Sequence, residues 1–246
     1  MKQVASRMGM GLLVIVCLGM IGFVIWGLTP LGPMPEARQA LISDESVQVE
    51  TGKWLVFQST QDTPTAGLIL YPGGRVDYRS YAPLARMLAE QGYLVVIPRM
   101  PLNLAVLGVN SAAQIIEAYS SVGIWVVGGH SLGGAMAASY AVDHADQVDG
   151  VFLLAAYPAE SKPLTENSIP VLSITASEDG LTTVEKIRAV YDLFPKGTKW
   201  VTIEGGNHAG FGWYGDQTGD GMASIPREEQ QDLVVIAIHE FMSSIY

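Results

Sequence analysis

Residues 124–134 read IWVVGGHSLGG, and this stretch decides the fold. Its first half is a short apolar run of the kind that forms a buried strand. A Gly-x-Ser-x-Gly pattern follows, with Ser131 between Gly129 and Gly133. A serine on a tight strand-to-helix turn needs such glycines, because the chain there passes too close to itself for a β-carbon. We therefore predict a strand, a sharp turn that exposes Ser131, and a helix over 132–143.

Short β-rich runs recur on both sides of this stretch and alternate with helix-like segments. Further strands are predicted at 46–50, 53–58, 67–71, 93–98, 150–155, 171–176 and 199–203, and helices at 81–91, 112–120, 184–193 and 227–244. The first two strands flank a short Gly-containing turn and form a hairpin. The later alternation predicts a mainly parallel, eight-stranded α/β sheet with helices on both faces. Ligands bind such sheets at the carboxyl ends of the strands, so we expect the chemistry in the loops that follow them.

The composition of the chain excludes several classes of function. The 246 residues are 49% apolar and carry a net charge of -10, which argues against a disordered chain and against a nucleic-acid partner. The single cysteine, Cys17, leaves no pair for a disulfide or a thiolate zinc site. Asp216 and Asp220 resemble part of a calcium loop, but Thr218 and Arg227 stand where further ligands are needed. We expect no metal and no organic cofactor.

The serine turn and the residues after the later strands resemble the α/β-hydrolase superfamily. That family orders its triad as Ser, then Asp or Glu, then His, each after a strand. Here Ser-Glu-Asp-Gly at 177–180 and Glu-Gly-Gly-Asn-His-Ala-Gly at 204–210 follow the last two strands. The resemblance covers nearly all of the chain after its first 40 residues. It implies an α/β-hydrolase fold with Ser131 as nucleophile, Asp179 as acid and His208 as base.

The chemistry of the residues supports the same roles. A serine hydroxyl is a poor nucleophile until an imidazole takes its proton, and the imidazole needs a carboxylate to fix its tautomer. Of the four histidines, His130 lies inside the serine turn and cannot easily reach back to its neighbour's hydroxyl, and His144 and His239 are expected at helix-end or surface positions. His208 alone has the position after a strand that the base requires. Glu178 and Asp179 are adjacent, so either carboxylate could face the histidine. The offset of Asp179 before Gly180 resembles that of the family acid, and we favour Asp179 for this reason.

Acyl transfer also needs backbone N–H donors where negative charge develops on the carbonyl oxygen. Leu132, the residue after the serine, is expected to supply one donor. The stretch Tyr-Pro-Gly-Gly-Arg at 71–75 resembles the His-Gly-Gly oxyanion loop of the family, with Pro72 in place of the histidine. The second donor is then Gly74 or Arg75.

The sequence also bears on the substrate. The segment 157–169, where many related hydrolases insert a lid, is short. This disfavours a lipase with a large lid and favours small-molecule or polymer-end esters. Arg75 and Arg99 fall in loops at the catalytic edge of an acidic domain, so we expect them to bind a substrate carboxylate. Trp213 follows the proposed base and is expected to wall the acyl pocket.

Other functions remain open on the same residues. Dienelactone hydrolases are a similar branch with little lid, but they use a cysteine where Ser131 stands. Lactone hydrolysis is therefore possible beside ester hydrolysis, and so are acyltransferase, depolymerase and peptidase reactions of the same triad. A different class of function is a catalytically silent binding domain, because a fold alone does not fix function.

An uncharged, apolar run of 21 residues, 8–28, precedes the α/β pattern. A helix of that length spans about 30 Å, the thickness of the hydrocarbon core of a bilayer. Lys2 and Arg7 precede the run, so the positive-inside rule places the N-terminus in the cytoplasm and the domain outside it. We expect a membrane anchor and linker over 1–35 and a tethered hydrolase domain over 36–246. The alternative is a signal peptide whose cleavage secretes the domain.

Overall fold

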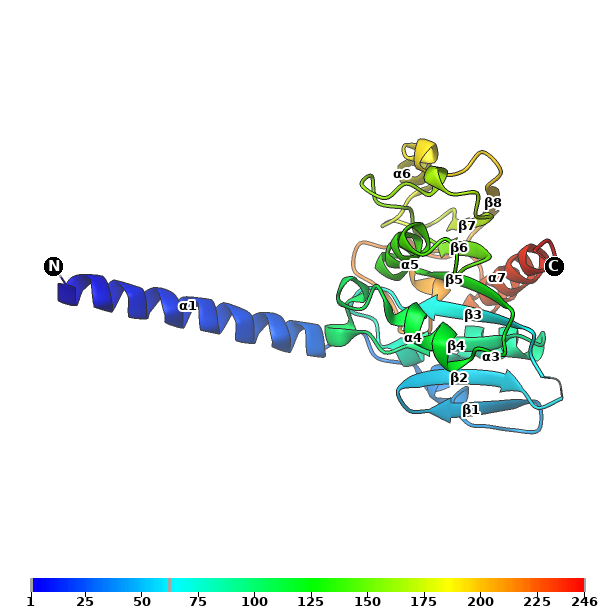
Figure 1. Ribbon diagram of the computed structural model, residues 1–246, viewed down its shortest axis with the longest axis horizontal. Coiled ribbons are helices and arrows are strands. Elements are labelled where there is room, and N and C mark those ends of the chain that lie inside the picture. Colours follow the sequence, from blue (N-terminus) through cyan, green and yellow to red (C-terminus); the bar gives the residue numbers. More distant parts are fainter. Residues whose placement is uncertain (1, 62, 246) are drawn as a thin grey trace.

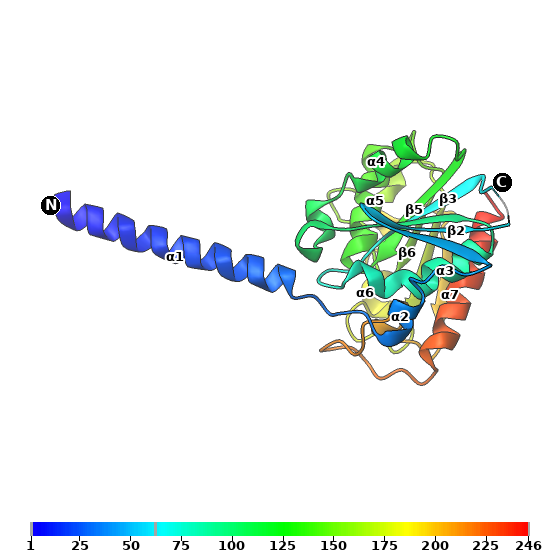
Figure 2. The ribbon, with the colours of Figure 1, turned by 90° about the horizontal axis from the view of Figure 1, so that it is seen from below.

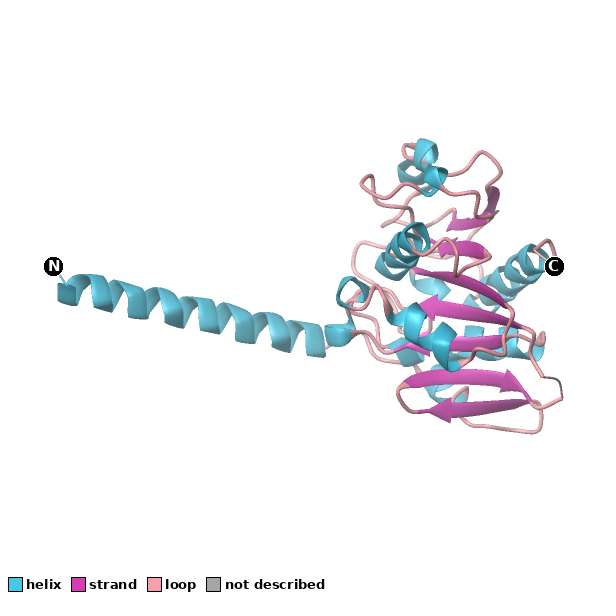
Figure 3. Ribbon diagram, in the orientation of Figure 1, coloured by secondary structure: helices cyan, strands magenta, loops and turns pink. Residues whose placement is uncertain are grey.

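The computed structural model describes residues 2–61 and 63–245, and its centre is one eight-stranded sheet with the order β1-β2-β4-β3-β5-β6-β7-β8. The strands stack as one twisted layer (Figures 1 and 3). They are β1 (Val47–Thr51), β2 (Trp54–Ser59), β3 (Ala66–Tyr71), β4 (Leu94–Pro98), β5 (Ile124–His130), β6 (Gly150–Leu154), β7 (Val171–Ala176) and β8 (Lys199–Ile203). The predicted number of strands is confirmed, and their bounds shift by only one or two residues.

The sheet is parallel except at one edge. β2 pairs antiparallel with both β1 and β4, whereas the other five pairings are parallel. Every residue of β3, β4, β6 and β7 is buried, as expected for parallel strands that are covered on both faces. The edge strands β1 and β8 keep exposed positions. The carboxyl ends of the parallel strands therefore meet at one edge of a rigid layer.

Helices cover the two faces in pairs (Figure 2). Helices α3 (Ala82–Glu90) and α7 (Arg227–Met242) pack on one face, and α4 (Ser111–Ala118) and α5 (Leu132–Asp143) pack on the other. The alternation of side chains along β3 supplies both cores: Leu68 lies in the first and Ile69 in the second. The short helix α2 (Pro35–Gln39) precedes β1.

The helix predicted over 184–193 is wrong in its second half. Helix α6 runs only from Val184 to Arg188, and a separate 3₁₀ turn covers Tyr191–Leu193. Val190 leaves the helical region with φ of -123°. The rings of Tyr191 and Phe194 then lie 4.2 and 4.7 Å from the ring of Trp200, measured between centroids. Aromatic packing onto the edge strand β8 therefore outweighs continuation of the helix.

Helix α1 (Lys2–Leu28) extends away from the domain (Figures 1 and 2). Its described side chains include exposed apolar groups such as Ile15 and Leu18. Within the part of the chain whose side chains are described, no helix combines the length and hydropathy that crossing a membrane requires. The transmembrane segment predicted at 8–28 is thus unconfirmed and stays a prediction.

Candidate active site

The turn between β5 and α5 has the geometry that the glycine pattern predicts. Ser131 has φ of 53° and ψ of -124°, a backbone conformation that residues with a β-carbon seldom adopt. A β-carbon on Gly129 would lie 2.5 Å from the carbonyl oxygen of Tyr71, and one on Gly133 would lie 2.3 Å from the same oxygen. This turn, here called the elbow, therefore packs closely against the end of β3, and Ser131 lies half-buried at its tip.

Asp179 and His208 form a buried pair at the same edge of the sheet. Asp179 lies in the loop at 177–180, here called the acid loop, and His208 lies in the loop at 204–210, here called the base loop. The Nδ1 atom of His208 is 2.8 Å from Oδ2 of Asp179. The other carboxylate oxygen, Oδ1, accepts hydrogen bonds from the N–H groups of Leu181 at 2.7 Å and Thr182 at 2.6 Å. Both oxygens are thus engaged, and the imidazole orientation is fixed.

Glu178 does not take part in this pair. Its side chain is exposed, and Oε1 accepts a long hydrogen bond from the Ser177 hydroxyl, at 3.4 Å. Its backbone instead joins the two loops, because the N–H of Glu178 donates to the carbonyl of Gly206 at 2.8 Å. Of the two adjacent carboxylates, the structure places Asp179 against His208.

His208 lies beside the elbow, although no hydrogen bond joins its ring to Ser131 Oγ among the described residues. The ring of His208 is 4.4 Å from the ring of His130, the residue before the serine, measured between centroids. Catalytic hydrogen bonds are often long in the absence of substrate and tighten when it binds. The three side chains therefore come from separate loops to one region, with the acid and base in contact.

His130 connects the elbow to the loop at 71–75, here called the oxyanion loop. The Tyr81 hydroxyl accepts a hydrogen bond from the N–H of Gly73 at 2.9 Å and lies 2.8 Å from Nδ1 of His130. The Tyr81 hydroxyl therefore links the oxyanion loop to the imidazole of His130. Burial, helped by the nearby His208, lowers the pKa of His130 well below its ordinary value. His130 is therefore a neutral spacer that aligns two loops.

The candidate oxyanion donors are Leu132 and Gly74. A β-carbon on Gly74 would lie 3.0 Å from Cδ2 of Leu132, so the two residues are neighbours. The N–H of Gly73 donates to Tyr81, and that of Arg75 donates to the carbonyl of Asn103 at 2.7 Å. Within the described residues, the N–H of Gly74 has no such acceptor. Of the two alternatives for the second donor, this arrangement favours Gly74.

The side chain of Arg75 faces the end of α1. Its Nε donates to the carbonyl of Trp26 at 3.1 Å, and Nη2 donates to the carbonyl of Thr29 at 2.7 Å. The guanidinium also lies 4.5 Å from the centroid of the Trp26 ring. The end of α1 thus engages two of the five N–H donors of Arg75, and a substrate carboxylate, as predicted, would have to bind to the remaining donors.

Arg99 and Trp213 lie apart from the serine. Arg99 is exposed and lines a cavity of about 440 Å³ with Trp54 and Gln114. Trp213 is buried, and its backbone N–H donates to the carbonyl of Ser80 at 2.8 Å. Neither side chain is among those that line the cavity at Ser131. Their predicted roles in substrate binding therefore gain no support from their positions.

A cavity of about 330 Å³ opens directly at Ser131. Its walls are mostly small and apolar, and they come from α5 and from the loop after β6. They are formed by Ser131, Leu132, Ala135, Ala155, Ala156, Tyr157, Pro158, Ala159 and Thr182. The length and composition of the sequence do not reveal this cavity, because it arises where two non-adjacent segments meet.

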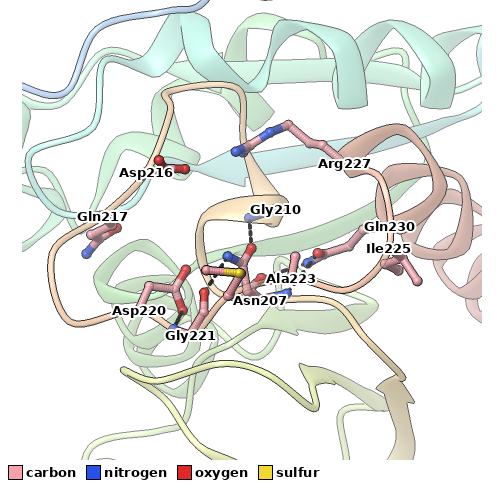
Figure 4. A pocket seen from close by; sticks show the side chains of 11 residues that line it. Asn207, Gly210, Asp216, Gln217, Asp220, Gly221, Ala223, Ile225, Arg227 and Gln230 are labelled. Carbon is pink, nitrogen blue, oxygen red and sulfur yellow. Dashed lines mark hydrogen bonds between the residues drawn. The ribbon is translucent and has the colours of Figure 1, made fainter.

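A second cavity, of about 450 Å³, lies along the base loop (Figure 4). Gln230 of α7 accepts a hydrogen bond from the N–H of Asn207 at 3.0 Å and donates one to its carbonyl at 2.8 Å. Asn207 also donates from Nδ2 to the carbonyl of Gly221 at 2.8 Å. Sequence reasoning missed this support. The sequence holds no signal for it, because the burial of Gln230 arises only when α7 packs against the base loop.

Comparisons with known proteins agree with this architecture. A sequence model of the Alpha/beta hydrolase family matches residues 67–232, and the chain belongs to this family. No curated protein sequence matches the chain.

Two solved proteins illustrate the structural likeness. A predicted CIB-like hydrolase from Thermoplasma acidophilum is 18% identical, with a TM-score of 0.58 over 79% of this chain and 99% of that chain. Est1E from Butyrivibrio proteoclasticus is 14% identical, with a TM-score of 0.57 over 81% and 98%. A structure of Est1E with bound ferulic acid gives a TM-score of 0.61 at 14% identity over 80% and 95%. At these identities the likeness establishes the fold.

Proposed function

We propose that the protein is a serine hydrolase that cleaves small carboxylic esters through an acyl-enzyme on Ser131. The observation that carries this proposal is the 2.8 Å contact between Asp179 and His208 beside the strained serine turn. A buried carboxylate that orients an imidazole next to a serine is the arrangement that activates a hydroxyl for acyl transfer. A catalytically silent binding domain, the alternative function, would not require a buried contact between Asp179 and His208.

The reaction follows from the placement of these groups. Ser131 Oγ attacks the ester carbonyl carbon while Nε2 of His208 takes the hydroxyl proton, and Asp179 stabilises the imidazolium that forms. The N–H groups of Leu132 and Gly74 bind the oxyanion of the tetrahedral intermediate. The imidazolium then protonates the leaving alkoxide. In the second half, water gives a proton to Nε2 of His208 and attacks the acyl carbon. The bond from the acyl carbon to Ser131 Oγ then breaks, the imidazolium returns the proton to Oγ, and the acid is released.

The cavity at Ser131 favours a small acyl group. Its volume of about 330 Å³ and its alanine-rich lining suit a short aliphatic chain, and no long apolar channel leads from it in the lining described. The short segment between β6 and β7 also lacks room for a lid domain. We infer that acetate and butyrate esters are better substrates than long-chain esters.

Narrowing this cavity should change acyl selectivity. Ala135→Leu adds three carbons to its wall and is expected to lower kcat/KM for p-nitrophenyl butyrate about 10-fold more than for the acetate ester. Ala118→Leu, an exposed change on α4, serves as the control and should leave both rates unchanged. Equal losses on both esters would contradict the assignment of this cavity, and no hydrolysis of any ester by the wild type would contradict the proposed activity.

We also propose that α1 tethers the domain to the cell membrane, with the domain outside the cytoplasm. The apolar run at 8–28 supports this, as do the exposed apolar side chains along the described part of α1. The chain just after α1 is bound into the domain: Leu31 donates to the carbonyl of Arg75 at 2.8 Å, and Met34 donates to that of Trp213 at 2.8 Å. These contacts favour retention of the segment over cleavage.

Charges in α1 should release the protein. Val14 and Ile21 are both exposed, so changing both to Lys leaves the domain untouched. Each lysine costs about 3 kcal/mol at the centre of a membrane helix. The wild type should stay in the membrane pellet after alkaline carbonate extraction, whereas the double variant should be soluble. Protease added to intact cells should digest the domain. If carbonate extracted the wild type from the membrane pellet, the tether would be contradicted. If the domain in intact cells resisted the added protease, the proposed orientation would be contradicted.

A further inference from the structure

The loop between the proposed base and helix α7 carries Asp220, whose carboxylate is satisfied by backbone N–H groups. Oδ1 accepts from the N–H of His208 at 3.1 Å, of Gly180 at 3.2 Å and of Gly221 at 2.8 Å. Oδ2 accepts from the N–H of Ala209 at 2.8 Å. No Lys or Arg forms an ion pair with Asp220 among the described residues. Backbone N–H groups, most of them in the candidate site, are therefore the hydrogen-bond partners of this carboxylate.

The partners of Asp220 belong to both loops of the acid–base pair. Gly180 directly follows Asp179 in the acid loop, and His208 and Ala209 belong to the base loop. A single carboxylate thus bridges the two segments whose side chains must meet. A hydrogen bond from an N–H group to an ionised carboxylate is stronger than one between neutral groups, so the carboxylate favours the close approach of the two loops.

The glycines around Asp220 allow its loop to approach the acid loop at backbone distance. A β-carbon on Gly221 would lie 1.9 Å from the carbonyl oxygen of Glu178, and one on Gly180 would lie 2.5 Å from the carbonyl oxygen of Gly219. Gly219 itself has φ of 89°, a conformation that favours glycine. The glycine-rich sequence of this segment is thus explained by close packing onto the acid loop. Figure 4 shows Asp220 and Gly221 next to Asn207 of the base loop.

We infer that Asp220 is a positioning residue that holds the base loop against the acid loop, so that His208 keeps its contact with Asp179. This inference rests on the proposed function of the Ser131, Asp179 and His208 side chains. Without the bridge, the base loop would keep its support from Gln230 and the hydrogen bond between Glu178 and Gly206, but it would lose its connection to Gly180 and the support at the His208 backbone. The backbone of His208 would then be held less firmly, and a misplacement of about 1 Å costs about 10²-fold in rate.

Asp220→Asn tests this role, because the amide keeps the shape but turns an N–H donor toward backbone N–H donors. We expect kcat for p-nitrophenyl butyrate to fall about 10²-fold with KM unchanged. Hydrogen exchange of backbone amides in the base loop should become faster. Asp220→Glu, which keeps the carboxylate, should recover most of kcat.

Asp216→Asn is the matched control, since Asp216 lies in the same segment, is exposed and has no hydrogen bond or ion pair within the described chain. It should behave as wild type in all measurements. Wild-type kcat in Asp220→Asn would overturn the inference, and so would a lower kcat with unchanged base-loop exchange or with an equally large change in KM. So would equal losses in Asp220→Asn and Asp220→Glu. An inactive wild type would instead refute the proposed function, and base-loop exchange would still test the bridge.

Discussion

Replacing Ser131 by Ala should lower kcat for p-nitrophenyl butyrate by about 10⁶-fold, to the rate that binding and oxyanion stabilisation alone provide. The change removes the only atom that forms the acyl-enzyme, so no compensating route through the same intermediate exists. Labelling by a fluorophosphonate should disappear together with hydrolysis. In the wild type, mass spectrometry of the labelled protein should locate the adduct on the peptide that contains Ser131.

The fold should survive this substitution. Ser131 Oγ makes no hydrogen bond among the described residues, so its loss leaves no buried partner unsatisfied, and the melting temperature should be unchanged. Ser139→Ala is a matched control on the following helix, where the hydroxyl donates to the carbonyl of Ala135 at 3.0 Å. It should keep full activity and labelling. Hydrolysis that persists in Ser131→Ala would refute the role of Ser131 as nucleophile. A wild type that is neither labelled nor active would favour the alternative of a catalytically silent binding domain.

The parts of the fold that could be predicted are those set by local pattern. β5, the elbow and α5 follow from an apolar run, a spaced pair of glycines and a small-residue helix that are contiguous in the chain. The central strands β3 and β6 are short apolar segments whose burial on both faces suppresses polar alternation. The alternation of strands and helices predicts a mainly parallel sheet and hence the edge at which the loops gather, whereas the order of the strands does not follow from these local patterns.

The parts that could not be predicted depend on contacts between distant segments. Nothing near Tyr81 in the sequence indicates that its hydroxyl links Gly73 to His130. The position of Arg75 in the oxyanion loop suggests a free guanidinium, yet the end of α1 occupies it. Asp220 has acidic neighbours that suggest a metal loop, whereas its partners are backbone N–H groups 11 to 40 residues away and at the adjacent Gly221.

The choice of the triad acid shows the same limit. Glu178 and Asp179 are adjacent and chemically equivalent in the sequence, so only a resemblance separates them. In the folded chain the carbonyl of Ala176 accepts from the N–H of Asp179 at 3.2 Å, and this turn directs one side chain inward and leaves the other in solvent. The distinction arises from the path of the backbone after β7, which a list of residue types does not contain.

Replacing Asp179 by Asn is therefore expected to lower kcat by about 10⁴-fold with little change in KM. The N–H groups of Leu181 and Thr182 both point at Oδ1, so the amide of the variant must keep its oxygen there and turn its NH₂ toward His208. Nδ1 must then accept, which leaves the imidazole proton on Nε2. In that tautomer Nε2 cannot take the proton of Ser131.

Glu178→Gln is the control for Asp179→Asn, because Glu178 is the exposed neighbour of Asp179, and this variant should retain wild-type kcat. Thermal melts of both variants should match the wild type, and steady-state rates on p-nitrophenyl butyrate provide the comparison. A large loss in Glu178→Gln with an active Asp179→Asn would reassign the acid to Glu178, and full activity in both would remove the carboxylate from the mechanism.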